Sequence, residues 1–137
     1  MAVTANSIIT PQTPLARQAV ATTADVAFNA PVTTVTLLDR ADNLNGARIA
    51  RLYAMPRAAI AAALNCLVYA YDGTTKTLID SALMAVVAPS ATVANPKTDF
   101  GYTDVSPFYL RAGFGLEIAI GTTIANGVVF KAEGGLY

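Results

Sequence analysis

Apolar and polar residues alternate over short stretches of this chain, and clusters of turn-forming residues separate the stretches. Alternation with a period of two is typical of β-strands that bury one face. Short strands at regular spacing predict an all-β sandwich or barrel. The jelly roll is the most economical of these, so we expect a jelly-roll-like antiparallel β-sandwich of about eight strands. The apolar stretches are residues 26–29, 33–38, 47–55, 66–71, 75–80, 81–88, 107–111, 116–121 and 127–133.

The stretch CLVYAYDGTTKTLID (66–80) predicts a β-hairpin whose first strand is apolar on both faces. Asp72-Gly73 marks its turn. We expect one face to meet the opposing sheet and the other to be covered by a sister subunit or a larger assembly. The two faces are Leu67, Tyr69 and Tyr71 on one side and Cys66, Val68 and Ala70 on the other.

A second turn signal, Asn126-Gly127, predicts a final hairpin that pairs residues 116–121 with 127–133. Both signals predict type I′ turns, which need a positive φ at both central residues.

Three other stretches carry specific local predictions. In residues 47–55, strict alternation places Ile49, Tyr53 and Met55 on one face. Residues 57–65 are rich in alanine, yet they lack an N-cap and a glycine stop, so we expect them to be extended. Residues 81–87 predict a short helix, because Ser81 is a suitable N-cap.

Residues 1–18 are expected to form an extended N-terminal arm, which leaves residues 19–137 as a single β-sandwich domain. Two prolines in the arm fix φ and withhold N–H donors, which disfavours a helix. Its apolar side chains are unusual for a disordered tail. The arm therefore lies on a neighbouring subunit, packs on its own domain, or is a frayed terminus.

The composition limits the kinds of partner. Hydrophobic residues make up 54% of the 137 residues and charged residues 13%, about half of the ~25% charged content usual for soluble domains. Nine basic residues balance nine acidic ones, which argues against electrostatic binding to nucleic acid or to a membrane surface. A protein with so weakly charged a surface either is poorly soluble or has part of that surface covered by partners.

No segment of the sequence predicts membrane insertion or export. Apolar runs fall short of the ~20 residues of a spanning helix. The first ten residues lack the pattern of a signal peptide. We therefore expect synthesis in a cytoplasm.

Candidate catalytic residues are few. The chain contains no histidine, which removes the commonest general base and metal ligand. The one cysteine, Cys66, lies in an apolar strand, so we expect a buried and inert thiol. Carboxylate pairs can act in glycoside hydrolysis, but turn capping is the expected role of Asp72, Asp80, Asp99 and Asp104. We therefore predict no enzyme activity, no metal and no cofactor.

Aromatic residues cluster around the long loop 89–106 and the strand after it. Such a cluster can stack on sugars or nucleobases, but few basic residues accompany it. Core packing and subunit contact are the expected roles of Phe100, Tyr102, Phe108, Tyr109 and Phe114.

Four segments together resemble the capsid cement, or decoration, proteins of tailed bacteriophages. They are NGARIARLYAMPRA, YDGTTKTLIDSALMA, TDFGYTDVSPFYLRAGFGLEIAIG and GVVFKAEGGLY. The resemblance covers residues 31–137 and implies a jelly-roll protein on the outer capsid surface of the virion. Such proteins bridge neighbouring major capsid protein subunits and associate with themselves. For this chain we expect a homodimer first and a trimer second, with no nucleic-acid or membrane partner.

The residues expected at these interfaces are apolar side chains of the arm and exposed aromatic residues. They are Ile8, Ile9, Pro11, Pro14, Leu15, Tyr69, Tyr71, Phe108, Tyr109, Phe114 and Tyr137. The alternative function is a carbohydrate- or receptor-binding β-sandwich module of a phage fibre or tail, since jelly rolls are common among lectins.

Overall fold

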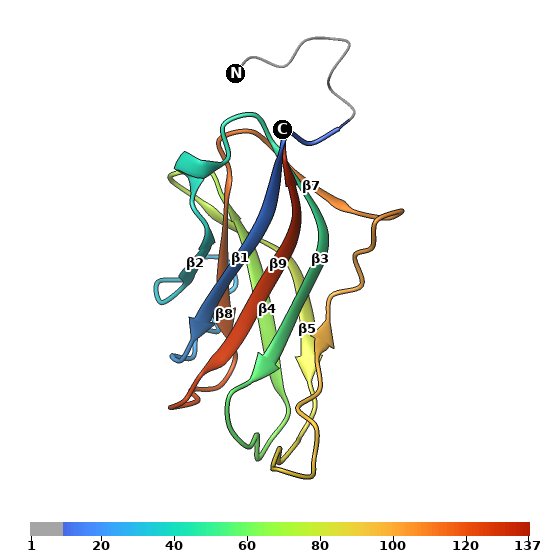
Figure 1. Cartoon of the computed structure of the whole chain (residues 1–137). Coiled ribbons are helices and arrows are strands. Elements are labelled where there is room, and N and C mark those ends of the chain that lie inside the picture. The colour runs from blue at the N-terminus through green and yellow to red at the C-terminus, as the bar shows by residue number, and fades with distance from the viewer. Residues whose placement is uncertain (1–9) are drawn as a thin grey trace.

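A computed structural model describes residues 10–137, which form two antiparallel β-sheets packed face to face (Figure 1). The predicted all-β sandwich is confirmed. Sheet A has the order β1 (Thr13–Ala21), β9 (Val128–Leu136), β3 (Ala47–Pro56) and β6 (Thr98–Asp99), and β7 (Phe108–Leu110) also pairs with β3. Sheet B has the order β2 (Val35–Leu38), β8 (Gly115–Ile120), β4 (Leu64–Tyr71) and β5 (Lys76–Met84). A single 3₁₀ turn, η1 (Arg40–Asp42), follows β2.

The strands pair in a nested order. β1 pairs with β9, β2 pairs with β8, β3 pairs with β6 and β7, and β4 pairs with β5. The structure thus shows an antiparallel β-sandwich, whereas the finer expectation of a jelly roll stays a prediction.

The core lies between the two sheets and is filled by side chains that alternate along their strands. Ile49 and Phe130 from sheet A and Val68 and Ile118 from sheet B are all fully buried in it. β8 is buried along its whole length, because it is flanked by β2 and β4 in the centre of sheet B.

The predicted hairpin of residues 66–80 is confirmed as β4 and β5, but its turn is wider than predicted. Only Gly73 has a positive φ, of 103°. Residues 72–75 form a four-residue loop in which the Asp72 N–H donates to the Thr75 carbonyl. The Asp72 carboxylate completes this loop by accepting two further N–H groups, so no type I′ turn is needed.

Three other predictions of local structure are wrong. The segments 116–121 and 127–133 do not form a hairpin, because β8 belongs to sheet B and β9 to sheet A. The chain crosses between the sheets there, and only Gly127 of the Asn126-Gly127 pair has a positive φ. Residues 81–84 continue β5 rather than start a helix. Residues 26–29 lie in a loop.

A β-bulge in β3 overturns the prediction for residues 47–55. The register against β9 shifts between Ile49 and Arg51, so Ala50 is an extra residue and the alternation changes phase there. Ile49 therefore faces the core, whereas Tyr53 and Met55 face outward from sheet A. Gly134 is needed opposite the bulge, since a Cβ at this position would lie 1.8 Å from the Arg48 carbonyl oxygen.

The predicted arm ends too late in the chain. Residues 13–18 belong to β1, which pairs with β9 over its full nine residues. Leu15 is buried in the core, so this part of the segment is integral to the sandwich.

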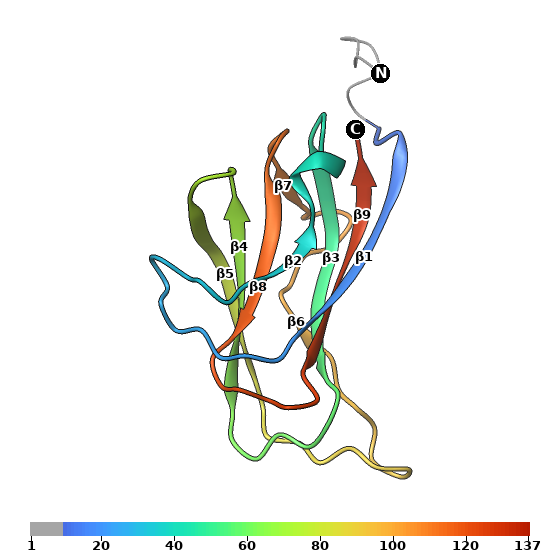
Figure 2. The ribbon, with the colours of Figure 1, turned by 90° about the vertical axis from the view of Figure 1, so that its left-hand side faces the viewer.

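The second apolar face of β4 is covered by the chain itself. Leu67, Tyr69 and Ala119 form a small buried cluster on the outer side of sheet B, and Leu78 packs against them. Figure 2 shows the loop between β1 and β2 passing outside this sheet. The Asp25 N–H in that loop donates to the Ile120 carbonyl of β8 at 2.9 Å, which places the loop against sheet B, and burial together with the charge of Asp25 raises the pKa of Tyr69. The expectation that a partner covers this face is therefore wrong for Leu67 and Tyr69.

Candidate interaction surface

The Cys66 thiol lies in the core and is remote from any surface site. It is fully buried, as predicted. Burial raises its pKa to about 12, because a thiolate cannot be solvated there. Among residues 10–137, no group of His, Cys, Asp and Glu side chains is arranged to hold a metal ion.

Two of the four candidate carboxylates cap turns, as predicted. Asp72 Oδ1 accepts the N–H groups of Thr75 at 2.7 Å and Thr74 at 2.8 Å, and these bonds lower its pKa. Asp99 Oδ1 accepts the Gly101 N–H at 2.8 Å.

The other two candidate carboxylates have different partners. Asp80 Oδ2 accepts the hydroxyl of Tyr102 at 2.6 Å. Burial and this hydrogen bond together raise the pKa of Tyr102. The Asp104 carboxylate lies 3.7 Å from the Arg48 guanidinium. Asp99 and Asp104 share a depression of about 630 Å³, whereas Asp72 lies at the β4–β5 turn.

A polar cluster occupies the outer face of sheet B. The Lys76 ammonium donates to Thr34 Oγ1 at 2.6 Å and lies 3.8 Å from Glu117 Oε1. The Thr34 hydroxyl donates to the same Glu117 oxygen at 3.1 Å. The largely buried Glu117 carboxylate is thus neutralised within the chain, which such a group requires.

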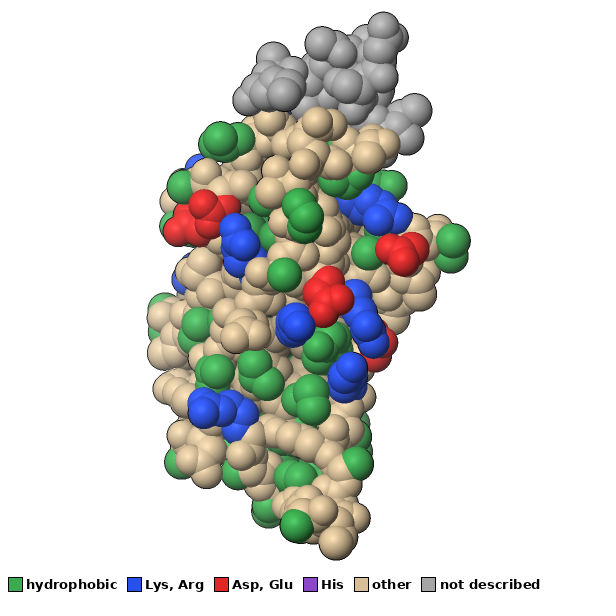
Figure 3. All heavy atoms as spheres, viewed as in Figure 1, with side chains coloured by type: hydrophobic (Ala, Val, Ile, Leu, Met, Phe, Trp, Pro, Cys, Tyr) green, Lys and Arg blue, Asp and Glu red, His purple; other side chains and the backbone are tan. Residues whose placement is uncertain are grey.

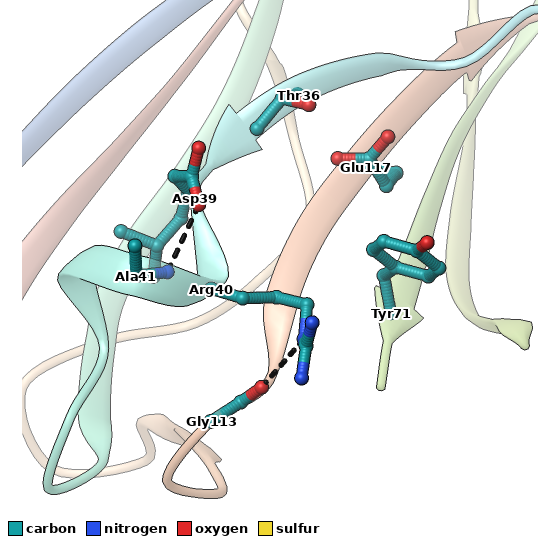
Figure 4. A pocket seen from close by; sticks show the side chains of 8 residues that line it. Thr36, Asp39, Arg40, Ala41, Tyr71, Gly113 and Glu117 are labelled. Atoms are coloured by element: carbon teal, nitrogen blue, oxygen red, sulfur yellow. Dashed lines mark hydrogen bonds between the residues drawn. The ribbon is translucent and has the colours of Figure 1, made fainter. Parts of the chain in front are cut away.

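Arg40 lies beside this cluster in a depression of about 380 Å³ (Figure 4). Its Nε donates to the Gly113 carbonyl at 2.9 Å, which holds the η1 turn against the loop before β8. The Arg40 guanidinium lies 5.8 Å from the centroid of the Tyr71 ring, and the Lys76 ammonium lies 5.4 Å from it. Two cations of the chain therefore already engage this ring, which leaves it poorly placed to stack on a ligand.

The outer face of sheet A carries charges of both signs close together (Figure 3). Lys131 and Glu133 form an ion pair at 3.2 Å. The Tyr53 ring lies beneath Lys97, at 4.7 Å, and Arg51, at 5.5 Å. Glu133 thus neutralises Lys131, whereas Lys97 and Arg51 engage the Tyr53 ring, so each of these cations already has a partner within the chain.

Four of the clustered aromatic residues pack against the core, as predicted. Phe100 lies 6.3 Å from Phe130, and Tyr102 lies 5.7 Å from Phe108, measured between ring centroids. Phe114 is also half-buried against the core. Tyr109 differs, because 62% of its surface is exposed.

The structure gathers some of the predicted interface residues at one end of sheet A. Pro11 lies against Gly135, and Tyr109 and Tyr137 lie together beside Arg48. This is the end where β1 begins and β9 ends (Figure 1). Pro14 is exposed on the same strand as Leu15.

The remaining predicted interface residues are less accessible. Leu15 and Tyr69 are buried within the chain, so neither presents its side chain to a partner. Tyr71, Phe108 and Phe114 are half-buried. Ile8 and Ile9 lie outside the described residues.

Sequence reasoning missed most of the exposed apolar side chains. Val105, 95% exposed, lies in the loop before β7, and Val32, 83% exposed, lies in the loop before β2. The signal for Val105 was present, since it stands alone among polar residues of a long loop. The other large exposed side chains are Val26, Phe28, Leu44, Leu83, Val86 and Val93.

No helix within residues 10–137 is both long and apolar enough to cross a membrane. No protein-family model, curated protein or solved structure gives a significant match to the chain.

Proposed function

We propose that this chain is a structural protein of a tailed-bacteriophage virion. In this role it binds the outside of the capsid and stabilises the lattice by bridging neighbouring major capsid protein subunits. The observation that carries the proposal is the set of large apolar side chains that are exposed, most of them on the loops of the sandwich. Apolar loop tips bind by burial against a complementary surface.

Two other features support a binding role based on shape and burial. The polar groups of the sheet B cluster are engaged with one another, and on sheet A Lys131 is paired with Glu133 while Arg51 and Lys97 engage the Tyr53 ring. The sequence also resembles capsid cement proteins in the segments quoted above. The proposed site of action is the outer capsid surface, after synthesis in the host cytoplasm.

The stabilising mechanism is mass action. A protein that binds only the assembled lattice lowers the free energy of that lattice relative to its free subunits. Each specific contact needs about 800 Å² buried per partner. The exposed valines and leucines supply apolar area, at roughly 25 cal/mol for each Å² removed from water.

The proposal is tested on particles whose genome encodes this chain. Cryo-electron microscopy is expected to show density for the sandwich outside the shell, and particles lacking the chain are expected to lose infectivity at a lower temperature. Adding the purified protein back should restore heat resistance. A shell without such density, and with unchanged heat resistance after deletion, contradicts the proposal.

The alternative of a carbohydrate-binding module has less support. The aromatic side chains that suggested a stacking platform pack against the core, apart from Tyr109. Binding of the purified protein on a glycan array, lost in a Tyr109→Ala variant, would favour this alternative over the capsid role.

A further inference from the structure

The edges of the two sheets differ in how they are protected against pairing. β5 has a bulge at Ile79 and turns the Asp80 carboxylate away from solvent toward Tyr102. β2 has four residues and a bulge, and β6 and β7 have two and three residues. Bulges, inward charges and short lengths are features that blunt sheet edges. Among the described edge strands, only β1 is both long and regular, with nine residues in unbroken register.

The hydrogen-bond pattern shows which groups of β1 point away from the sheet. The Arg57 N–H donates to the Gly127 carbonyl, and the Phe100 N–H donates to the Leu52 carbonyl. Odd-numbered residues of β9 therefore bond to β3, and even-numbered ones bond to β1. By the register of β1 against β9, Leu15, Arg17 and the other odd-numbered residues of β1 bond inward to β9.

The backbone groups of the alternate residues point to the free edge. These residues are Pro14, Ala16, Gln18 and Val20. Their side chains share the outer face of sheet A and carry no charge. Figure 2 views the molecule from the side of this edge, and β1 runs across the front of the sandwich there.

We propose that two copies of this chain pair antiparallel along β1, about a two-fold axis that passes through Gln18. Sheet A would then be continuous across the dimer. In this register Gln18 lies opposite Gln18 of the second copy, and Ala16 lies opposite Val20 of the second copy. Every outward N–H and C=O group of Ala16, Gln18 and Val20 then has a partner, with the Ala16 carbonyl exchanging the long bond of 3.4 Å that it accepts from the Arg17 guanidinium for one from the second copy.

The same register accommodates the two residues of β1 that would otherwise discourage pairing. Pro14 has no N–H, but it lies opposite Thr22 of the second copy, and the Thr22 carbonyl already accepts the Ile124 N–H at 3.0 Å. Arg17 lies 3.6 Å from Asp42 of its own chain. It faces Ala19 of the second copy rather than another cation, so no like charges meet.

The pairing is tested by disulfide trapping. Residues opposite one another in a hydrogen-bonded pair have Cα atoms about 5.5 Å apart, which a disulfide can bridge. Gln18→Cys is therefore expected to form a covalent dimer under mild oxidation. The Ala16→Cys variant alone should not form a covalent dimer, because residue 16 of one copy and residue 16 of the other lie four residues apart along the paired strands, about 13 Å. A mixture of Ala16→Cys and Val20→Cys proteins should form the mixed dimer, and the buried Cys66 does not compete.

Light scattering on the uncrosslinked protein gives the second measurement. The unmodified chain is expected to be a dimer, and Gln18→Pro and Gln18→Lys are expected to raise the dissociation constant at least about tenfold. The Gln18 N–H points away from β9, so neither change breaks the β1–β9 ladder, and the melting temperature of the monomer reports any misfolding. Gln12→Lys adds the same charge off the axis and should leave the dimer intact.

A monomer at all concentrations, a trimer, or a dimer that persists in both Gln18 variants overturns this inference. The inference is independent of the proposed capsid role. Particle density and heat resistance test that role, whatever the state of the free protein.

Discussion

Asp25 is the residue on which the loop between β1 and β2 depends. Its largely buried carboxylate accepts the N–H groups of Ala27, Val32 and Thr33 and the Thr33 hydroxyl, at 2.8 to 3.0 Å. Desolvation alone would raise its pKa, but these four donors outweigh that effect and lower it. The loop that covers the outer cluster of sheet B is thus closed around one carboxylate.

The pH dependence of stability should reveal this arrangement. Since the folded pKa of Asp25 lies below its unfolded value, the carboxylate stabilises the fold above about pH 4 and loses this effect as the pH falls through the folded pKa. Asp25→Asn should lower the free energy of unfolding by about 1–3 kcal/mol at pH 7. In urea titrations the difference from the unmodified chain should shrink toward pH 3. A difference that is equal at both pH values would contradict the account.

Gly134 is a second residue with a specific requirement. Gly134→Ala would place its Cβ against the carbonyl of Arg48 in the bulged strand. We expect a loss of roughly 1–3 kcal/mol or more in the free energy of unfolding. Gly121→Ala is the matched control, because a Cβ there meets its nearest atom at 3.4 Å. Equal melting temperatures for the two variants would show that the close approach is unimportant.

At the scale of elements, one hydrogen bond joins the edges of the two sheets at the open side of the sandwich. The Tyr102 hydroxyl, in the loop after β6, donates to Asp80 in β5. Tyr102→Phe leaves Asp80 Oδ2 without this donor, while the Ser81 N–H still donates to Oδ1 at 2.8 Å, so the free energy of unfolding should fall by about 1–3 kcal/mol. The double variant Tyr102→Phe, Asp80→Ala completes a mutant cycle. Additive effects in that cycle would mean that the bond contributes nothing.

Strand positions were largely predictable from the sequence, whereas their partners were not. Alternation located β3 and β9, and continuous apolar stretches bounded by turn residues located β4 and β8, because both patterns are local properties. It could not show that β8 and β9 lie in different sheets, since a tight hairpin and a crossing between sheets begin with the same turn residues. The phase change at Ala50 was also hidden, because a bulge depends on the partner strand.

The candidate surface was less predictable than the fold. Pro11, Tyr109 and Tyr137 come together only through the pairing of β1 with β9 and of β7 with β3. Tyr69 was assigned to an interface because its strand is apolar on both faces. The sequence does not reveal that the β1–β2 loop folds over that face.

At the scale of the whole molecule, eight of the nine large apolar side chains that are exposed among the described residues form three groups by position, and Leu44 lies apart in the loop after η1. The three groups are Val26, Phe28 and Val32 before β2, Leu83, Val86 and Val93 around the end of β5, and Val105 and Tyr109 near β7. Replacing each group with Ser or Thr should change the free energy of unfolding by no more than about 0.5 kcal/mol per residue. At least one group should reduce binding to particles that lack the chain. If all three variants bind as the unmodified chain does, the exposed apolar side chains are not the contact.

The nested pairing of β1 with β9 also determines how the molecule responds to tension. Thr13 lies opposite Leu136, so both ends of the paired strands emerge at the same pole. A force applied between these ends would break the hydrogen bonds between β1 and β9 one after another, instead of loading all of them at once. The sandwich would therefore yield at a lower force when pulled between Thr13 and Leu136 than when β1 and β9 are pulled along their length from opposite poles, which loads all the hydrogen bonds between them together.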